Sequence, residues 1–159
     1  MSVSAPSPEC LQQFLRFQLP GHTQAMLPTQ HLTEILNLSL SQIIPIPDVN
    51  PAMMGVCNWR GEVLWLLDLG AWLGLEPLYQ QSLRQAKLSV ILISHQGQTL
   101  GLGVDQVAQM LWCDEGQIQP LTNPKATPEL THCLQGYWSV LGEDPVLVLN
   151  GESILNAQI

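Results

Sequence analysis

The stretch from Met53 to Leu69, MMGVCNWRGEVLWLLDL, constrains the fold of this chain more than any other segment. It reads as two β-strands joined at Arg60-Gly61, because apolar residues alternate on either side of this polar pair. Apolar residues occupy both faces of the second strand, which predicts a strand that is covered on both sides. A fold built around such a hairpin must supply a second layer of structure to cover it.

Four polar residues interrupt this apolar run: Asn58, Arg60, Glu62 and Asp68. Burying a polar or charged group is costly unless the group is paired. Each of the four is therefore expected to have a partner within the fold, or to lie at an edge where another protein meets it.

The composition favours an interaction protein over a nucleic-acid or membrane binder. The 159 residues are enough for one domain with a hydrophobic core. Only 11% of the residues are charged, against about a quarter in an average soluble protein, so the surface must be rich in apolar and amide groups. The net charge of −8 argues against nucleic acid or an anionic membrane as a partner, since both are bound by basic patches.

The cysteines and the N-terminus predict an intracellular location. The four cysteines include no CxxC pair, which favours free thiols in a reducing compartment over a disulfide framework. Residues 1–10 are rich in serine and proline, which predicts a flexible tail without the features of an export signal. No apolar run is long enough to span a bilayer, so we expect a cytoplasmic protein that does not insert into the membrane.

Short alternating segments separated by turn residues extend along most of the chain. They predict about nine or ten strands without βαβ alternation, which is typical of an all-β barrel architecture. The sequence shows no convincing internal repeat. A short closing helix is expected over residues 151–157.

Two other segments are expected to break the simple succession of strands. Residues 29–36 predict a short helix, with Thr29 as its N-cap and Leu32, Ile35 and Leu36 at helical spacing. Residues 42–46 predict an edge strand, because Pro45 cannot donate a hydrogen bond to a neighbouring strand.

The sequence holds no motif of a catalytic site. A nucleophile elbow, a P-loop and an HExxH zinc motif are all missing, and His132-Cys133, the one adjacent pair of a histidine and a cysteine, is too few ligands for a zinc site. Asp68 and Asp105 are a conceivable carboxylate pair for acid–base chemistry, but the preferred interpretation is that each ties down a strand end. The five tryptophans are expected to lie mostly in the core, with one or two as interface anchors.

Five short motifs occur in a fixed order along the chain. They are LTEI at residues 32–35, PIP at 45–47, GVCNWRG at 55–61, LGLGVDQV at 100–107 and PVLVLN at 145–150. Together they resemble the CheW family of adaptors, which couple bacterial chemoreceptors to the histidine kinase CheA. The resemblance extends from Phe14 to about Leu155, so residues 11–157 are expected to form a CheW-like domain. Trp59, Trp65 and Gly70 depart from the family pattern, which has Leu, a small residue or Pro, and Arg at these positions.

The resemblance implies a mainly β fold of two packed five-stranded SH3-like β-barrels with short helices, no catalytic activity and no cofactor. In that family one barrel face docks the regulatory domain of a CheA-type histidine kinase. A groove between the barrels takes the cytoplasmic tip of a methyl-accepting chemoreceptor, which would recruit the protein to membrane-bound receptor arrays. The kinase- and receptor-binding residues implied for this chain are Leu32, Glu34, Ile35, Arg60, Gly61 and Val104.

Alternative functions stay open at this point. A β-barrel enzyme or small-ligand-binding protein would show polar groups converging in one pocket, and a structural protein would only self-associate. Among adaptors, chemotaxis, phototaxis and pilus-based twitching motility all fit the sequence.

We further predict an ion pair between Glu34 and Arg60. An arginine is always ionised and needs water or an acceptor, and Arg60 lies in a segment with almost no other charge. The family resemblance places Glu34 against this hairpin on the partner-binding side; the alternative is two independently solvated charges. Leu32 and Ile35 are expected to add apolar contacts to the interface, unless both simply fill the core.

Overall fold

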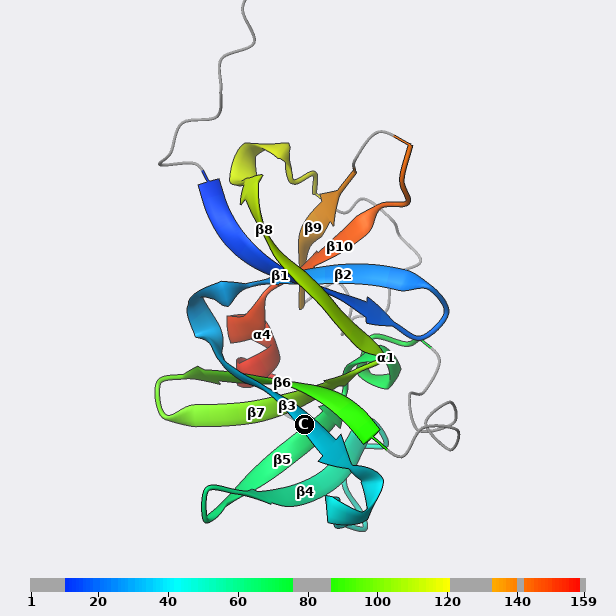
Figure 1. Ribbon diagram of the computed structural model, residues 1–159, viewed down its shortest axis with the longest axis vertical. Helices are drawn as coiled ribbons and strands as arrows, with labels where there is room; N and C mark the ends of the chain where they lie inside the picture. The colour runs from blue at the N-terminus through cyan, green and yellow to red at the C-terminus, as the bar shows by residue number, and fades with distance from the viewer. Residues whose placement is uncertain (1–10, 76–86, 121–132, 140–141, 158–159) are drawn as a thin grey trace, which may run out of the picture.

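The structure is a computed structural model that describes residues 11–75, 87–120, 133–139 and 142–157. In these residues the chain forms ten β-strands, which make two five-stranded sheets. Figure 1 shows the two sheets stacked one above the other, with the C-terminal helix between them. The strands are β1 (Leu11–Leu19), β2 (Thr23–Pro28), β3 (Leu32–Ser39), β4 (Met53–Trp59), β5 (Glu62–Asp68), β6 (Lys87–His95), β7 (Gln98–Val104), β8 (Gln106–Asp114), β9 (Leu134–Trp138) and β10 (Val146–Leu149). The helices are η1 (Thr29–His31), η2 (Leu40–Gln42), α1 (Leu69–Trp72), η3 (Glu115–Gln117) and α4 (Gly151–Asn156).

The sheet with strand order β3-β6-β7-β5-β4 closes into what we call the first barrel. Neighbouring strands pair antiparallel, except that β5 and β7 run parallel. After β3 the chain passes through η2 and pairs with β4 at an isolated bridge between Ile44 and Val56. A Cβ atom on Gly55 would fall on the carbonyl oxygen of Ile44. A residue without a side chain is therefore required where the sheet closes.

The sheet with strand order β8-β1-β2-β10-β9 closes in the same way into the second barrel. Here too one pair of neighbours, β2 and β10, runs parallel and the others run antiparallel. After β8 the chain passes through η3 and pairs with β9 at an isolated bridge between Gln119 and Tyr137. A Cβ atom on Gly136 would fall on the carbonyl oxygen of Gln119. These two closed five-stranded sheets confirm the expected mainly β fold of two barrels.

The two barrels share one topology in circularly permuted order. In the first barrel the edge strand, 3-10 turn, closing bridge, hairpin, helix and second hairpin follow one another along the chain. The second barrel follows the same order from β8 through η3, β9 and β10 to α4. Its second hairpin is formed by β1 and β2, which come first in the chain. The duplication is therefore visible in the strand pairings although the sequence shows no convincing repeat.

One hydrophobic core extends through both barrels. It joins Phe17 of β1 to Ile91 of β6, and Ile154 of α4 packs into it from the helix between the sheets. Each barrel also has a smaller core of its own, which includes Leu66 in the first barrel and Phe14 in the second. The shared core predicts that the barrels unfold together rather than as separate domains.

Two side chains begin the helices that follow β5 and β10. Asp68 is fully buried and accepts a hydrogen bond from the Ala71 N–H at 3.2 Å at the start of α1. Asn150 accepts one from the Ser153 N–H at 3.2 Å at the start of α4. These caps satisfy backbone N–H groups that have no partner within the helix. The expectation that Asp68 ties down a strand end is confirmed.

The predicted helix over residues 29–36 is wrong. Thr29 begins the 3-10 turn η1, and the segment from Leu32 belongs to β3, which pairs antiparallel with β6. Positions 32, 34 and 36 are half-buried with exposed residues between them, and this period of two fits a strand. The helical spacing of three apolar residues was the weaker signal, because β6 offers hydrogen bonds along the whole segment.

The predicted edge strand over residues 42–46 is also wrong, since only a single bridge forms there. Gln42 ends η2, and Ile44 alone pairs with β4. Pro45 and Pro47 have no N–H groups with which to continue the ladder.

The tryptophans divide between the cores and the surface, as expected. Three of them are half-buried and pack against a hydrophobic core: Trp59, Trp72 and Trp138. Trp65 and Trp112 are 38% and 64% exposed, and the other three are half-buried. Large apolar rings are thus available at the surface as anchors.

Each barrel holds a buried thiol on one of its outermost strands. Cys57 of β4 and Cys113 of β8 are free thiols that are almost fully buried. Burial raises the pKa of both thiols, and the neighbouring Asp114 carboxylate raises that of Cys113 further. Cys133 is buried and accepts a hydrogen bond from the Trp72 Nε1 at 3.5 Å. The prediction of free thiols is thus confirmed for Cys57 and Cys113, and residue 10 lies outside the described residues.

Candidate functional site

The β4–β5 hairpin makes a tight turn at Arg60-Gly61. Both residues have positive φ, 51° and 81°, which is the combination of a type I′ turn. The Asn58 Oδ1 accepts a hydrogen bond from the Gly61 N–H at 3.0 Å, so the amide that interrupts the apolar run has its expected partner. This turn fixes the direction in which the Arg60 side chain leaves the first barrel.

Glu34, Trp59 and Arg60 meet beside this turn and are called the Glu34 cluster below. The Arg60 Nη2 lies 3.1 Å from the Glu34 Oε2, and the Trp59 Nε1 donates to the same oxygen at 3.3 Å. The guanidinium carbon of Arg60 lies 5.1 Å from the centroid of the Trp59 ring, which adds a cation–π contact. The predicted ion pair between Glu34 and Arg60 is confirmed.

The Glu34 cluster connects the two outermost strands of the first-barrel sheet. Glu34 belongs to β3 and Trp59 to β4, the first and last strands of the order. The pairing of β3 with β6 shifts register between Leu32 and Glu34, and such irregularities re-aim side chains. The cluster therefore lies where the barrel closes, as does the Ile44–Val56 bridge.

The exposure of the cluster indicates that it contributes little to stability. The Arg60 side chain is 70% exposed and that of Glu34 is 34% exposed. An ion pair so accessible to water contributes about 0–1 kcal/mol to folding. What the cluster fixes is the arrangement of a positive charge, a negative charge and an aromatic ring at one end of the barrel.

The other predicted site residues lie in different environments. Ile35 is 39% exposed, so it does not fill the core, and Gly61 is exposed at the turn. Leu32 is half-buried and packs against the shared core. Val104 is fully buried at the end of β7, so its side chain is out of reach of a partner and does not belong to the surface formed by the others.

Among the described residues, most of the exposed large apolar side chains belong to the first barrel or its loops. They are Ile35, Ile44, Val49, Val63 and Trp65. In the second barrel, the exposed large apolar residues are Met110 and Trp112, both on β8. The predicted apolar interface would lie among the exposed residues of the first barrel, and it stays a prediction.

Sequence reasoning missed Trp59 as a member of the site. It treated this residue only as a departure from the family pattern, although a half-buried indole N–H needs an acceptor. Glu34 was already expected beside the same hairpin. The need of the Trp59 N–H for an acceptor was therefore the signal that could have linked Trp59 to Glu34 and Arg60.

The described residues assemble no candidate metal centre: no group of three His, Cys, Asp or Glu side chains among them could hold a metal ion. His132, half of the adjacent ligand pair, lies outside the described residues. Asp68 is engaged as a helix cap, and the Asp105 N–H donates to the Gln18 carbonyl at 2.9 Å where β7 leads into β8. In the part of the chain that is described, no helix is long and apolar enough to cross a membrane.

Comparison with known proteins identifies the family. The family model described as "CheW-like domain" matches residues 13–158. This chain belongs to the CheW-like domain family. The motifs that carry the resemblance in the sequence, including the Arg60 turn and the Glu34 segment, all lie within the matched residues.

A relative and a solved structure agree with this assignment. The chain is 35% identical over 83 residues to a protein of Rhizobium etli named "Probable chemotaxis protein CheW"; this match covers 52% of the chain and 47% of that relative. It is similar in structure to the scaffolding protein TtCheW from Thermoanaerobacter tengcongensis, with a TM-score of 0.70 and 21% sequence identity. That match covers 91% of this chain and 89% of the other, and at such low identity it supports the fold alone.

Proposed function

We propose that this protein is a non-catalytic adaptor that couples a methyl-accepting chemoreceptor to a CheA-type histidine kinase. The observation that carries the proposal is the Glu34 cluster, which lies at the family's motif positions beside the exposed Ile35. The names of the Rhizobium etli relative and of TtCheW support a role in chemotaxis signalling and scaffolding.

The kinase-binding surface is assigned to the first barrel. Ile35 supplies apolar area that loses water on docking, and the Glu34 cluster supplies charges that fix the orientation of the partner. The regulatory domain of the kinase has a similar barrel fold in this family, so two barrels pack against each other. Binding of this kind needs no reaction chemistry, only a rigid surface.

The receptor tip is assigned to the junction between the barrels. Leu32 lies where the chain enters the first barrel from η1, half-buried against the shared core. Val104 supports this junction from within the core rather than by contact with the receptor. Simultaneous binding of the receptor and the kinase would recruit the protein from the cytoplasm to membrane-bound receptor arrays.

Replacement of Ile35 by aspartate tests the kinase surface. The Ile35→Asp variant should lose most of its affinity for the regulatory domain of a CheA-type kinase from the same organism, measured by isothermal titration calorimetry. Its thermal transition should change little, because the side chain it replaces is exposed.

Met110→Asp provides the matched control. Met110 occupies the corresponding position of β8 in the second barrel and is 51% exposed. This variant should bind the kinase domain as the unchanged protein does. Equal loss of affinity in both variants would contradict the assignment to the first barrel, and an unfolded Ile35→Asp protein would show that Ile35 supports the core.

A further inference from the structure

A concave apolar pocket lies on the first barrel, away from the Glu34 cluster. Its volume is about 330 Å³, at the lower end of the range for small-molecule sites. Strands of the first barrel and the end of α4 both contribute to it. The lining residues are Val49, Met53, Trp65, Gln98, Thr99, Leu100, Leu155 and Ala157.

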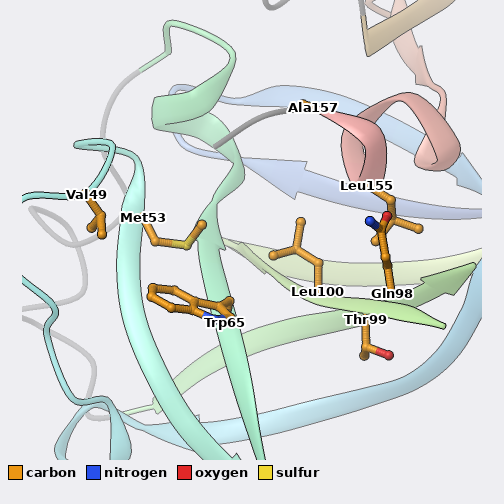
Figure 2. A pocket seen from close by; sticks show the side chains of 8 residues that line it. All are labelled: Val49, Met53, Trp65, Gln98, Thr99, Leu100, Leu155 and Ala157. Atoms are coloured by element: carbon orange, nitrogen blue, oxygen red, sulfur yellow. The ribbon is translucent and has the colours of Figure 1, made fainter.

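The walls of the pocket come from parts of the chain that are far apart in sequence. Figure 2 shows Met53 above the indole of Trp65 on one side and Leu155 with Gln98 on the other, while Leu100 lies between them. Trp65 is available for this role because it points outward from β5, where its neighbours Leu64 and Leu66 point inward. A Pro or small residue, common in the family at this position, would remove the aromatic wall.

Among the described residues, no ionisable side chain lines this pocket, although the chain as a whole carries a net charge of −8. A charged ligand would lose its hydration there without gaining a counter-charge, which is unfavourable. The polar groups of the lining are the Gln98 amide and the Thr99 hydroxyl, both on exposed residues. The pocket therefore suits an uncharged molecule that is apolar over most of its surface and carries one or two hydrogen-bonding groups.

The identity of the walls favours a flat aromatic ring over an aliphatic group. The Trp65 indole offers a face or edge for an aromatic pair, and the Met53 thioether makes favourable contacts with aromatic rings. A cavity of this volume accommodates one or two fused rings rather than a larger ligand.

We propose that this pocket is a binding site for a free, uncharged aromatic small molecule with one or two rings. Leu155 and Ala157 lie on or next to α4, which follows β10 of the second barrel, whereas the other lining residues belong to the first barrel or the loop before β4. A bound ring would therefore contact both halves of the molecule and hold α4 against the first barrel. The site is independent of the proposed adaptor function and would exist whether or not the protein binds a kinase.

Indole is a suitable probe, because it is neutral, aromatic and carries a single N–H donor. Titration of the full chain, labelled with ¹³C at the methionine methyl groups, should give a saturable shift of the Met53 signal. The Met110 signal on β8 should not move. Indole-3-acetate, which has the same rings and a negative charge, should bind roughly tenfold more weakly or not at all, and cyclohexanol should bind more weakly than indole.

Two variants locate the site. Trp65→Ala should weaken indole binding roughly tenfold, whereas Trp112→Ala, which removes an exposed tryptophan of the second barrel, should leave it unchanged. Ala157→Phe should block the pocket from the α4 side without removing any wall, so it tests the site even if Trp65→Ala fails to fold.

The outcomes are distinct from those for the adaptor function. A non-saturable Met53 shift, equal binding by Trp65→Ala, or binding that persists in Ala157→Phe would overturn the proposal. Equal affinity for indole-3-acetate would overturn the requirement for an uncharged ligand, and equal affinity for cyclohexanol would overturn the requirement for an aromatic ring. Kinase binding is measured separately with Ile35→Asp, so either proposal can fail alone.

Discussion

The two barrels close by the same device but present different surfaces. In each, a 3-10 turn brings the chain back to an isolated bridge opposite a glycine, Gly55 in the first barrel and Gly136 in the second. Among the described residues, such a cluster of charged and aromatic side chains at a hairpin turn is seen on the first barrel, and residues 140 and 141 of the corresponding hairpin lie outside them. The comparison teaches that barrel closure belongs to the fold, whereas the side chains at the hairpin end are not part of the closing device and are proposed to serve recognition.

The outermost strands β3 and β8 carry exposed apolar side chains at corresponding positions. Ile35 of β3 lies opposite Ile91, and Met110 of β8 lies opposite Leu15, so the two exposed side chains occupy equivalent places. Each strand also shifts register near this point. One topology thus offers two similar edges, and the Glu34 cluster is what distinguishes the edge of the first barrel.

The largest expected effect concerns the core that the barrels share. Phe17→Ala should destabilise the protein by about 3–5 kcal/mol, because it removes a fully buried ring from this core. Circular dichroism and tryptophan fluorescence should report a single coincident urea transition for the variant and for the unchanged protein. Two separate transitions would show that the barrels are independent domains and would contradict the shared core.

The second-largest effect is expected at the glycines where each barrel closes, Gly55 and Gly136. Gly55→Ala and Gly136→Ala should each cost about 3 kcal/mol, because the added methyl group meets a backbone oxygen that cannot move without opening the bridge. Gly142→Ala is the control: its φ is +83° and no atom lies within 4 Å of the added Cβ, so only backbone strain of about 1 kcal/mol remains. If urea denaturation shows that Gly136→Ala is tolerated and Gly55→Ala is not, the two closures are not equivalent.

Much of this fold could be predicted from local pattern. The alternation around Arg60-Gly61 predicted the central hairpin, and short alternating segments predicted about nine or ten strands, because alternation and turn residues act over short distances. The segment after Thr29 was ambiguous, because three apolar residues fit a helical spacing while the alternation fits a strand. Its pairing with β6 decided between them, and that contact is remote in the sequence.

The long-range arrangement could not be predicted from residues alone. Nothing in β8 indicates that it pairs with β1 or that it completes a permuted copy of the first barrel. The pairing of Glu34 with Arg60 was accessible only through the family resemblance, and Trp59 was missed. The pocket under Trp65 depends on where α4 packs, which no local pattern specifies.

The buried thiols give a smaller effect that both barrels should share. The pKa of Cys57 and of Cys113 is raised above its ordinary value of 9.0, so the folded state favours the protonated thiol. This stabilisation is complete below the ordinary pKa and is lost as the pH rises through the raised one. The urea midpoint should therefore fall above about pH 9.

Variants show which barrel is responsible for this pH dependence. Cys57→Val and Cys113→Val should each reduce the fall of the midpoint, because each removes one titrating thiol. A pH dependence that is unchanged in both variants would mean that other groups cause it.

The measurement that tests the account most directly is a charge swap at the Glu34 cluster. Glu34→Arg and Arg60→Glu should each impair assembly of a ternary complex with the receptor tip and the kinase, measured by co-sedimentation at low salt, where the pair matters most. The stability of each variant should change by no more than about 1 kcal/mol. Corresponding swaps at Arg16 and Glu143, an ion pair of 3.8 Å on the second barrel, should leave assembly unchanged. The account predicts that the double swap at Glu34 and Arg60 restores part of the lost assembly; losses that simply add in the double variant would contradict it.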